Sequence, residues 1–262
     1  MTKISVVMPS YQSALFIYNT LQSVIDQTVI PSQVLIIDDG STDNTCSIIE
    51  EFSLKHPEFN IQLIKSLHNG PGAARNIGIQ TATSEWIAFL DSDDIWFPNK
   101  IAVTLQAINE YPKANFFCHN ETMISEDGSS SFLDYSRYYS SLTPLPKQLY
   151  KKNLFSTSAV VCKRSDLLDN NGFDEHLSSA QDYELWLRMS PNLSPIFIKQ
   201  ILGIYTVRKG NISTTRHFRR MINIWKVMKR HRSKAGNFLI FLYTIFRVTL
   251  SHLVGFLRTI GK

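Results

Sequence analysis

Three carboxylates close one apolar run of this chain, in the stretch Phe89-Leu90-Asp91-Ser92-Asp93-Asp94. At an effective dielectric constant of about 20 and a spacing of about 5 Å, each pair of like charges repels by roughly 3 kcal/mol. A fold that gathers these charges at the end of a strand usually has a cation that offsets this cost. Hard oxygen ligands of this kind suit Mg²⁺ or Mn²⁺ bound to a phosphate group, although Asp-rich turns also follow strands that bind nothing.

The sequence up to these carboxylates alternates between apolar runs and helical patterns. The apolar runs occupy residues 4–8, 34–37, 61–64 and 86–90. Continuous apolar strands separated by helices predict an α/β fold with a mostly parallel central sheet and helices on both faces. Ligands bind to such sheets at the carboxyl ends of the strands. Because the polar clusters of this sequence follow those ends, we expect them to form one site.

A second acidic cluster, Asp38-Asp39-Gly40-Ser41-Thr42-Asp43, follows the second apolar run. Thr42 or Asp43 could cap the helix that comes next. Capping leaves Asp38 and Asp39 unexplained, and either carboxylate could accept a hydrogen bond from a base N–H.

A glycine turn opens a helix after the third run, in Asn69-Gly70-Pro71-Gly72-Ala73-Ala74-Arg75-Asn76. A helix start attracts anions, and an arginine one turn into the helix adds a fixed fork for phosphate. The alternative is a dinucleotide fingerprint. It is the weaker one, because Arg75 occupies the position of the third glycine and the turn does not follow the first strand.

Two further candidates lie in the second half of the chain. Asp182 stands at the start of a helical pattern, where a carboxylate could act as a base or simply complement the helix dipole. Arg208-Lys209-Gly210-Asn211-Ile212-Ser213 offers two cations after another apolar strand, and a solvated turn would have the same composition.

Composition and cysteine spacing favour a cytoplasmic protein. The 262 residues, 44% of them apolar, allow one large domain with an appendage. Cys46, Cys118 and Cys162 lie far apart and form no metal-ligand spacing, so we expect free thiols in a reducing compartment. No signal peptide is visible before the first strand.

The net charge of +5 conceals an asymmetry between the two ends of the chain. Residues 1–184 carry all 22 Asp and Glu and a net charge of −10. Residues 185–262 carry 15 Lys and Arg, no acid, and a net charge of +15. The first region suits a site built from carboxylates, and the second suits an anionic surface. We do not expect nucleic acid as that surface, because the basic region lacks any recognised binding motif.

Residues 214–262 are expected to form basic, amphipathic helices that follow a first domain at 1–213. The strongly apolar segment 237–257 has 21 residues and would extend about 32 Å as a helix, enough to cross a bilayer. Arg247 near its middle makes a crossing costly, so we expect a helix lying in the interface of an anionic membrane. The alternatives are a true span, or a helix packed on the first domain or in a dimer.

Five segments, taken in order, resemble family 2 glycosyltransferases of the GT-A fold, which has a Rossmann-like, mostly parallel sheet flanked by helices. Their agreement in order over about residues 4–213 is more specific than any one of them. The resemblance departs at Gln12 and Gln181, where many relatives carry Asn and Glu. The five segments are Val7-Met8-Pro9-Ser10-Tyr11, Ile37-Asp38-Asp39-Gly40-Ser41-Thr42-Asp43, Gly70-Pro71-Gly72-Ala73-Ala74-Arg75-Asn76, Phe89-Leu90-Asp91-Ser92-Asp93-Asp94 and Gln181-Asp182-Tyr183-Glu184-Leu185-Trp186-Leu187-Arg188.

The resemblance implies a nucleotide-sugar site at the matching positions. Pro9, Tyr11 and Asp39 would hold the nucleoside, with Asp39 facing the base. Arg75 would contact the nucleotide.

The resemblance also implies which residues perform the chemistry. Asp91 and Asp93 form the DxD motif, in which Asp93 would bind the metal on the diphosphate and Asp91 the ribose or the same metal. Asp182 would take the proton from the acceptor hydroxyl. Arg208, with Lys209 in reserve, would stabilise the departing diphosphate.

The implied activity is that of an inverting hexosyltransferase dependent on Mn²⁺ or Mg²⁺. It would move a sugar from a UDP-, GDP- or dTDP-sugar donor to a lipid-linked or polysaccharide acceptor. The setting would be cell-surface polysaccharide biosynthesis, peripherally on the cytoplasmic face of the cell membrane. Two alternatives remain, a catalytically silent nucleotide-sugar-binding scaffold subunit and a nucleotidyltransferase. The sugar, the acceptor and the oligomeric state cannot be deduced from the sequence.

Overall fold

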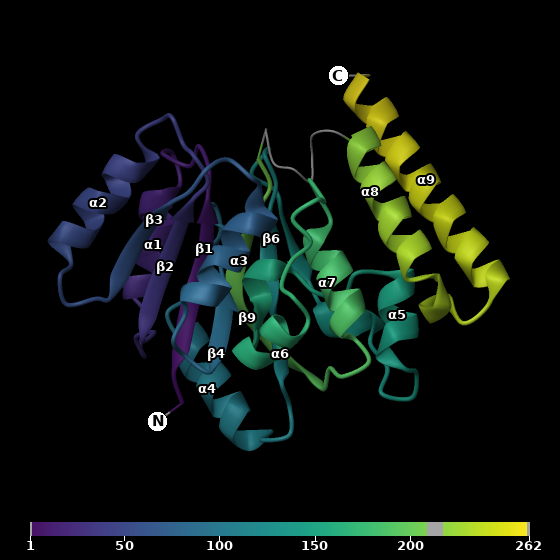
Figure 1. Ribbon diagram of the computed structural model, residues 1–262, viewed down its shortest axis with the longest axis horizontal. Helices are drawn as coiled ribbons and strands as arrows, with labels where there is room; N and C mark the ends of the chain where they lie inside the picture. The colour runs from purple at the N-terminus through teal and green to yellow at the C-terminus, as the bar shows by residue number, and fades with distance from the viewer. Residues whose placement is uncertain (1, 209–216, 261–262) are drawn as a thin grey trace.

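Strands and helices alternate through the first part of the chain, as the computed structural model shows for the residues that it describes, 2–208 and 217–260 (Figure 1). The elements up to residue 110 are β1 (Ile4–Ser10), α1 (Ile17–Ile25), β2 (Gln33–Asp38), α2 (Thr45–Lys55), β3 (Ile61–Lys65), α3 (Pro71–Thr81), β4 (Trp86–Phe89), β5 (Ile95–Trp96) and α4 (Lys100–Glu110). The later elements are β6 (Phe116–Ile124), β7 (Ser130–Leu133), the 3-10 helix η1 (Tyr135–Tyr138), α5 (Leu145–Lys151), η2 (Thr157–Ala159), β8 (Val160–Lys163), α6 (Arg164–Asp169), α7 (Gln181–Met189), β9 (Pro195–Thr206), α8 (His217–Arg230), η3 (Arg232–Ala235) and α9 (Phe238–Ile260).

The strands form one sheet in the order β3-β2-β1-β4-β8-β6-β9-β5, and β7 pairs with β6. As predicted, β3, β2, β1 and β4 are mutually parallel, and β9 is parallel to β6. β8 runs antiparallel between β4 and β6, and β5 runs antiparallel to β9. The α/β prediction is confirmed. The carboxyl ends of β1, β2 and β4 lie together at one edge of the sheet.

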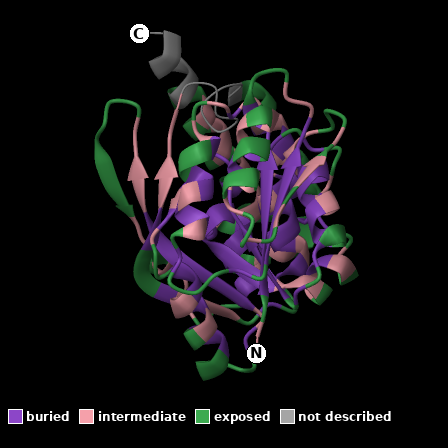
Figure 2. Ribbon diagram, turned by 90° about the vertical axis from the view of Figure 1, so that its left-hand side faces the viewer, coloured by how far each residue is buried: buried purple, intermediate pink, exposed green. Residues whose placement is uncertain are grey.

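Helices cover both faces of this sheet, because side chains alternate between the faces along each strand. Val7, Leu35 and Phe89 face a core built with α3, α5, α6, α7 and α8. Val6 and Ile36 face a second core built with α1, α2 and α4. In Figure 2 the central strands are buried, and exposed residues lie on the outer surfaces of the helices.

Helix α7 is anchored to the sheet by Trp186, whose side chain is fully buried. The rings of Phe89 and Phe116, from β4 and β6, lie 6.4 and 5.1 Å from the Trp186 ring. Phe173, in the loop before α7, also contacts Trp186, with the ring centroids 6.1 Å apart. A buried ring of this size contributes several kcal/mol to stability, about 3–5 kcal/mol by truncation to alanine.

The segment 125–143, whose polar composition predicts a long loop, contains β7 and η1. Asp134 accepts a hydrogen bond from the backbone N–H of Ser136 at 2.9 Å and so begins η1. The backbone N–H of Tyr135 donates to Asn120 on β6 at 3.0 Å. Side-chain-to-backbone bonds of this kind stabilise short elements that hydrophobic periodicity does not reveal.

The C-terminal helices lie side by side against α7 and α5 (Figure 1). Val227 and Met228 of α8 are fully buried in the first core. On α9, Thr244 is buried and Arg247 donates a hydrogen bond to the backbone carbonyl of Lys151. These two polar residues of α9 thus contact the rest of the protein.

The opposite side of α9 exposes a row of large apolar side chains. Its members are Phe238, Leu239, Leu242, Tyr243, Phe246, Leu250, Leu253 and Val254, each at least 40% exposed. Across the described ranges, no helix combines the length and hydropathy needed to cross a membrane.

Replacing Gly172 by alanine should destabilise the fold, because two penalties coincide there. The φ angle of Gly172 is +61°, and an added Cβ would overlap the carboxamide oxygen of Asn76. The left-handed backbone costs roughly 1–2 kcal/mol and the overlap about 1–3 kcal/mol more. Gly128→Ala is the matched control, because Gly128 has a φ of +81° and nothing within 4 Å of an added Cβ. Urea unfolding should show a larger loss for Gly172→Ala, and equal losses would contradict the packing argument.

Candidate active site

Three carboxylates follow β4: two of them pair with arginines, and the third is buried. Arg75 Nη2 donates to Asp91 Oδ1 at 2.5 Å, and Arg208 Nε donates to Asp93 Oδ2 at 2.7 Å. The Asp91 and Asp93 side chains are 32% and 13% exposed. Two arginines from distant parts of the sequence therefore hold the two aspartates of the DxD motif.

Asp94, the third carboxylate, is 2% exposed and ties the turn to its surroundings. It accepts hydrogen bonds from Ser158 Oγ at 2.5 Å and from the backbone N–H of Thr206 at 2.9 Å. Burial, and next the charge of Asp93, raise the pKa of Asp94 well above its usual range. The same Ser158 hydroxyl accepts from the backbone N–H of Asp91 at 3.0 Å. Asp94 is thus a structural residue beneath the two paired aspartates.

The donor set of this turn fits a hard divalent cation. Burial raises the pKa of Asp93, and the charge of Asp91 raises it further, while Arg208 opposes both effects. Carboxylate oxygens are the ligands that Mg²⁺ and Mn²⁺ prefer. Within the described ranges, no cluster of three or more His, Cys, Asp or Glu forms a metal site, so a cation here would rely on oxygens of the ligand it accompanies.

The glycine turn before α3 places Arg75 beside this motif. Gly70 has a φ of +93° and Pro71 begins the helix, which suits both residue types. Arg75, on the first turns of α3, is 6% exposed and its guanidinium lies 5.3 Å from the ring centre of Phe173. Phe173 is held in turn by Asn76, which bonds both its backbone N–H and its carbonyl. Arg75 is therefore fixed on both sides before any ligand binds.

Asp39 lies at the end of β2, as predicted, and holds the loop that leads into α3. Its two carboxylate oxygens accept the backbone N–H groups of Asn69 and Gly70, each at 2.9 Å. Tyr11, which is 44% exposed, stacks on the ring of His68 with a centroid distance of 4.2 Å. His68 Nδ1 lies 3.0 Å from Asp39 Oδ2.

Pro9 is buried within β1, paired in register with Ile37. Only its backbone can therefore contribute to a ligand site.

Gln12, three residues after Pro9, adopts a φ of +49°. Its side chain bonds Thr42 and the backbone N–H of Asp43. Gln12, where the sequence departs from the family pattern, thus joins the loops that follow β1 and β2.

Asp182 occupies the second position of α7, and its Oδ2 accepts a hydrogen bond from Asn153 at 2.9 Å. The neighbouring Gln181 packs against Gly72, where an added Cβ would lie 3.4 Å from the Gln181 side chain. Gly72 and Arg75 are on the same turn of α3, and Arg75 bonds Asp91. The starts of α3 and α7 therefore meet at the sheet edge that carries the DxD motif.

Beneath the site, the buried residue Glu121 lies on β6 with 1% exposure and accepts a hydrogen bond from Tyr135 Oη at 2.6 Å. Burial raises the pKa of Glu121 to about 7, opposed in part by this bond and increased by the charge of Asp91. The carboxyl of Glu121 is therefore partly protonated near neutral pH.

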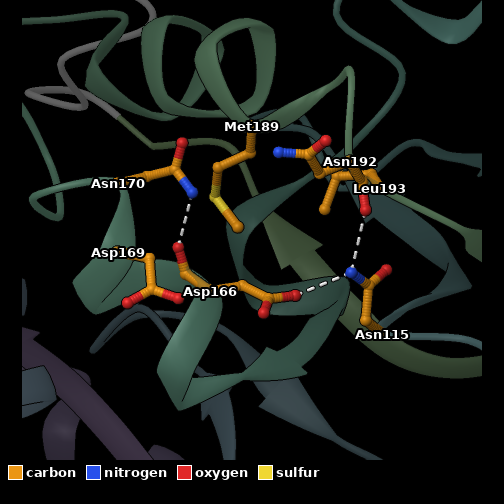
Figure 3. A pocket seen from close by; sticks show the side chains of 7 residues that line it. All are labelled: Asn115, Asp166, Asp169, Asn170, Met189, Asn192 and Leu193. Atoms are coloured by element: carbon orange, nitrogen blue, oxygen red, sulfur yellow. Dashed lines mark hydrogen bonds between the residues drawn. The ribbon is translucent and has the colours of Figure 1, made fainter.

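Two cavities lie at the opposite end of the sheet, where β4 and β6 begin. The smaller, of about 100 Å³, is lined by polar groups in which Asn115 bonds Asp166 and the carbonyl of Asn192 (Figure 3). The larger, of about 800 Å³, is an open groove beside residues 110–114 and 193–196. Neither is lined by a residue of the DxD motif. The chemistry of the carboxylates, not the size of a cavity, locates the candidate site.

Two residues of this site carried no signal in the sequence. Ser158 bonds the backbone of Asp91 and Asn153 bonds Asp182 from segments far away along the chain, and neither belongs to a local motif that identifies this role. Lys209, proposed as the reserve cation, lies outside the described residues, as do residues 210–213 of the same motif.

The sequence model described as Glycosyl transferase family 2 matches residues 5–167. This match covers more than half of the chain, which therefore belongs to that family. Among curated relatives, the chain is 27% identical over 231 residues to the UDP-Glc:alpha-D-GlcNAc-diphosphoundecaprenol beta-1,3-glucosyltransferase WfgD of Escherichia coli, covering 86% of this chain and 85% of WfgD. It spans only 30% of the length of other glycosyltransferases that it matches.

Two solved structures share the fold. TarS of S. aureus in complex with UDP-GlcNAc aligns with a TM-score of 0.73 at 23% identity, covering 89% of this chain and 66% of TarS. The mannosyltransferase PcManGT from Pyrobaculum calidifontis, in complex with GDP-Man and Mn²⁺, aligns with a TM-score of 0.70 at 17% identity, covering 96% of this chain and 74% of PcManGT. These similarities confirm the predicted GT-A fold.

Replacing Glu121 by glutamine should stabilise the protein at alkaline pH. Because the pKa of Glu121 is higher in the folded chain than in the unfolded chain, the folded state binds more protons between about pH 4.5 and pH 7, and wild-type stability falls across that window. Glutamine keeps the acceptor for Tyr135 and does not ionise. We expect a gain of about 1–3 kcal/mol at pH 8 that shrinks towards pH 5, measured by urea unfolding. Glu126→Gln, an exposed change on the same hairpin, should show no such pH dependence.

Proposed function

We propose that this chain transfers a sugar from a nucleotide-sugar donor to an acceptor hydroxyl, with inversion at the anomeric carbon. The observation that carries the proposal is that the start of α7, which bears Asp182, meets the start of α3 at the sheet edge where Arg75 and Arg208 pair with Asp91 and Asp93. Family membership supports the same activity. WfgD is named as a UDP-Glc-dependent glucosyltransferase, and TarS and PcManGT are in complex with UDP-GlcNAc and GDP-Man. A UDP- or GDP-sugar is therefore the expected donor, with a dTDP-sugar as a further candidate.

The nucleotide would lie along the ends of β1, β2 and β4. The exposed ring of Tyr11 offers a stacking surface for the base, and Asp39 fixes the neighbouring loop and retains lone pairs that could accept a base N–H. Arg75 and Arg208 would bind the diphosphate, because their planar guanidinium groups match phosphate oxygens. Arg208 would stabilise the charge that develops as the diphosphate leaves.

Asp93 and Asp91 would hold a divalent cation, Mn²⁺ or Mg²⁺, that neutralises charge on the diphosphate. Mn²⁺ in the PcManGT complex supports this choice of ion. Burial and the charge of Asp91 raise the pKa of Asp93, and a divalent cation beside the two carboxylates would offset that repulsion.

Asp182 would accept the proton of the acceptor hydroxyl while its oxygen attacks C1 of the sugar. The C1–O bond to the diphosphate breaks as the new C1–O bond forms, so a single displacement inverts the configuration. Asn153, bonded to Asp182 Oδ2, would orient the carboxylate for this step. A nucleoside diphosphate is released, whereas a nucleotidyltransferase would release pyrophosphate.

The acceptor is proposed to be a lipid-linked or growing glycan, with the enzyme held at the cytoplasmic face of an anionic membrane. WfgD supports the acceptor class, since its description names a diphosphoundecaprenol-linked sugar. The exposed apolar row on α9 and the exposed cations of α8, which include Arg219, Lys226 and Lys229, support the membrane contact.

Replacing Asp182 by asparagine should abolish transfer while donor binding persists. General-base assistance contributes about 10²–10⁴-fold to such reactions, so we expect kcat to fall by at least about 100-fold. The assay screens UDP-, GDP- and dTDP-sugars with Mn²⁺ or Mg²⁺, follows nucleoside diphosphate release with acceptor present, and measures donor binding by calorimetry.

Asp169→Asn is the control for this assay, because Asp169 is an exposed aspartate at the opposite end of the sheet. It should leave transfer within twofold of wild type. Undiminished transfer by Asp182→Asn would remove Asp182 from the proposed role. A wild type that binds donors but turns over none would favour the silent scaffold.

Placing charges on the exposed face of α9 should prevent membrane binding. Phe246 and Leu250 are 65% and 50% exposed, and each apolar side chain contributes about 1.5–3 kcal/mol when it leaves water. The Phe246→Glu/Leu250→Glu variant should lose flotation with phosphatidylglycerol vesicles, whereas wild type floats and binds neutral vesicles less. Leu54→Glu, at an 82% exposed site on α2, is the control. Equal flotation of all three proteins would refute the membrane contact.

A further inference from the structure

The start of α7 is held from outside by the C-terminal helix α8. Asn223, on α8, is 5% exposed, and its Nδ2 donates to Ser178 Oγ at 3.1 Å and to Ser179 Oγ at 3.0 Å. These two serines immediately precede Ala180, the residue before α7. A buried carboxamide from one segment thus fixes the turn from which Asp182 projects.

Within this turn, Gln181 Nε2 donates to the carbonyl of Leu177 at 2.7 Å, but the backbone at the start of α7 is strained. Ala180, the residue before α7, has a φ of +61°, and no side chain caps the helix. A non-glycine residue in the left-handed region costs roughly 1–2 kcal/mol. Such a conformation persists only where the surroundings impose it, and the bonds from Asn223 are part of those surroundings.

A second contact joins α8 to α7 one turn further on. Glu184 lies under the end of α8, with His231 Nε2 at 3.1 Å and Arg230 Nη1 at 3.3 Å from its Oε1. Arg188, on α7 itself, donates to Glu184 Oε2 at 2.6 Å. Burial alone would raise the pKa of Glu184, but the hydrogen bonds from His231 and Arg188 lower it to about 2. The carboxylate is therefore ionised and paired at neutral pH.

The helices are also joined through α5. Tyr150 Oη donates to the carbonyl of Met228 on α8 at 2.9 Å, and Tyr183 Oη on α7 donates to the carbonyl of Tyr150 at 2.9 Å. Together with the buried side chains of Val227 and Met228, these bonds leave α8 and α7 little freedom to move apart.

We propose that α8 positions Asp182, and that Asn223 is the positioning residue through which it acts on the start of α7. The C-terminal helices then serve the chemistry itself as well as any membrane contact. This inference rests on the proposed role of Asp182 as the base. It predicts a defect in turnover even with a soluble acceptor and no lipid.

The test is Asn223→Ala in the full chain, assayed for kcat, donor KM and thermal midpoint without vesicles. We expect kcat to fall roughly 10- to 100-fold with donor KM within about twofold, because a misplacement of about 1 Å can cost roughly 100-fold. The double variant Ser178→Ala/Ser179→Ala removes the same bonds from the other side. It should reproduce the loss if Asn223→Ala proves too unstable to assay.

Asn115→Ala is the matched control for lost stability. Asn115 also makes several hydrogen bonds, to Asp166, Asn192 and Ser194, but it lies at the opposite end of the sheet (Figure 3). It should lower the thermal midpoint as much as Asn223→Ala does, while kcat stays within twofold of wild type.

A double-mutant cycle separates positioning from general damage. If Asn223 acts through Asp182, Asn223→Ala should add no further loss of kcat in the Asp182→Asn background. Additive losses would overturn the inference, as would an unchanged kcat in Asn223→Ala. Equal activity of wild type and Asp182→Asn would instead mean that the proposed base is wrong, which is a distinguishable result.

Discussion

The negative charges of Asp91 and Asp93 are compensated by two arginines that lie more than a hundred residues apart in the sequence. Arg75 comes from α3 and Arg208 from the end of β9, so the negative charges after β4 are balanced only when both halves of the sheet are in place. Asp94 reinforces this dependence because it bonds Ser158 and the backbone of β9 from the same turn. The charges that define the site therefore also hold the two halves of the domain in register.

The edge of the sheet that carries the site could be predicted from the sequence, because runs such as 34–37 and 86–90 identify strands and the residues after them identify strand ends. The same pattern predicted that Asp91, Asp93 and Arg75 lie near strand ends at this edge. The bond between Ser158 and Asp94 spans 64 positions, and that between Asn153 and Asp182 spans 29. Only the fold brings such pairs together, so no local pattern could identify them.

Asp39 is predicted to bind a ligand, and the structure also gives it a role in the fold. The sequence suggested a ligand for a base, and the structure shows it accepting the backbone N–H groups of Asn69 and Gly70. A carboxylate has about four acceptor sites, so holding the loop leaves capacity for a ligand. The loop that Asp39 fixes leads directly into α3, which carries Arg75, so the positions of these two residues depend on each other.

The burial of α8 restricts which parts of this protein can be exchanged in an engineered variant. Val227 and Met228 belong to the same core as Trp186, and Glu184 is enclosed by side chains from both segments. The C-terminal helices cannot be exchanged as a cassette between relatives, because a foreign helix would meet an unmatched carboxylate and a cavity. A chimaera that preserves this packing must therefore transplant α7 and α8 together.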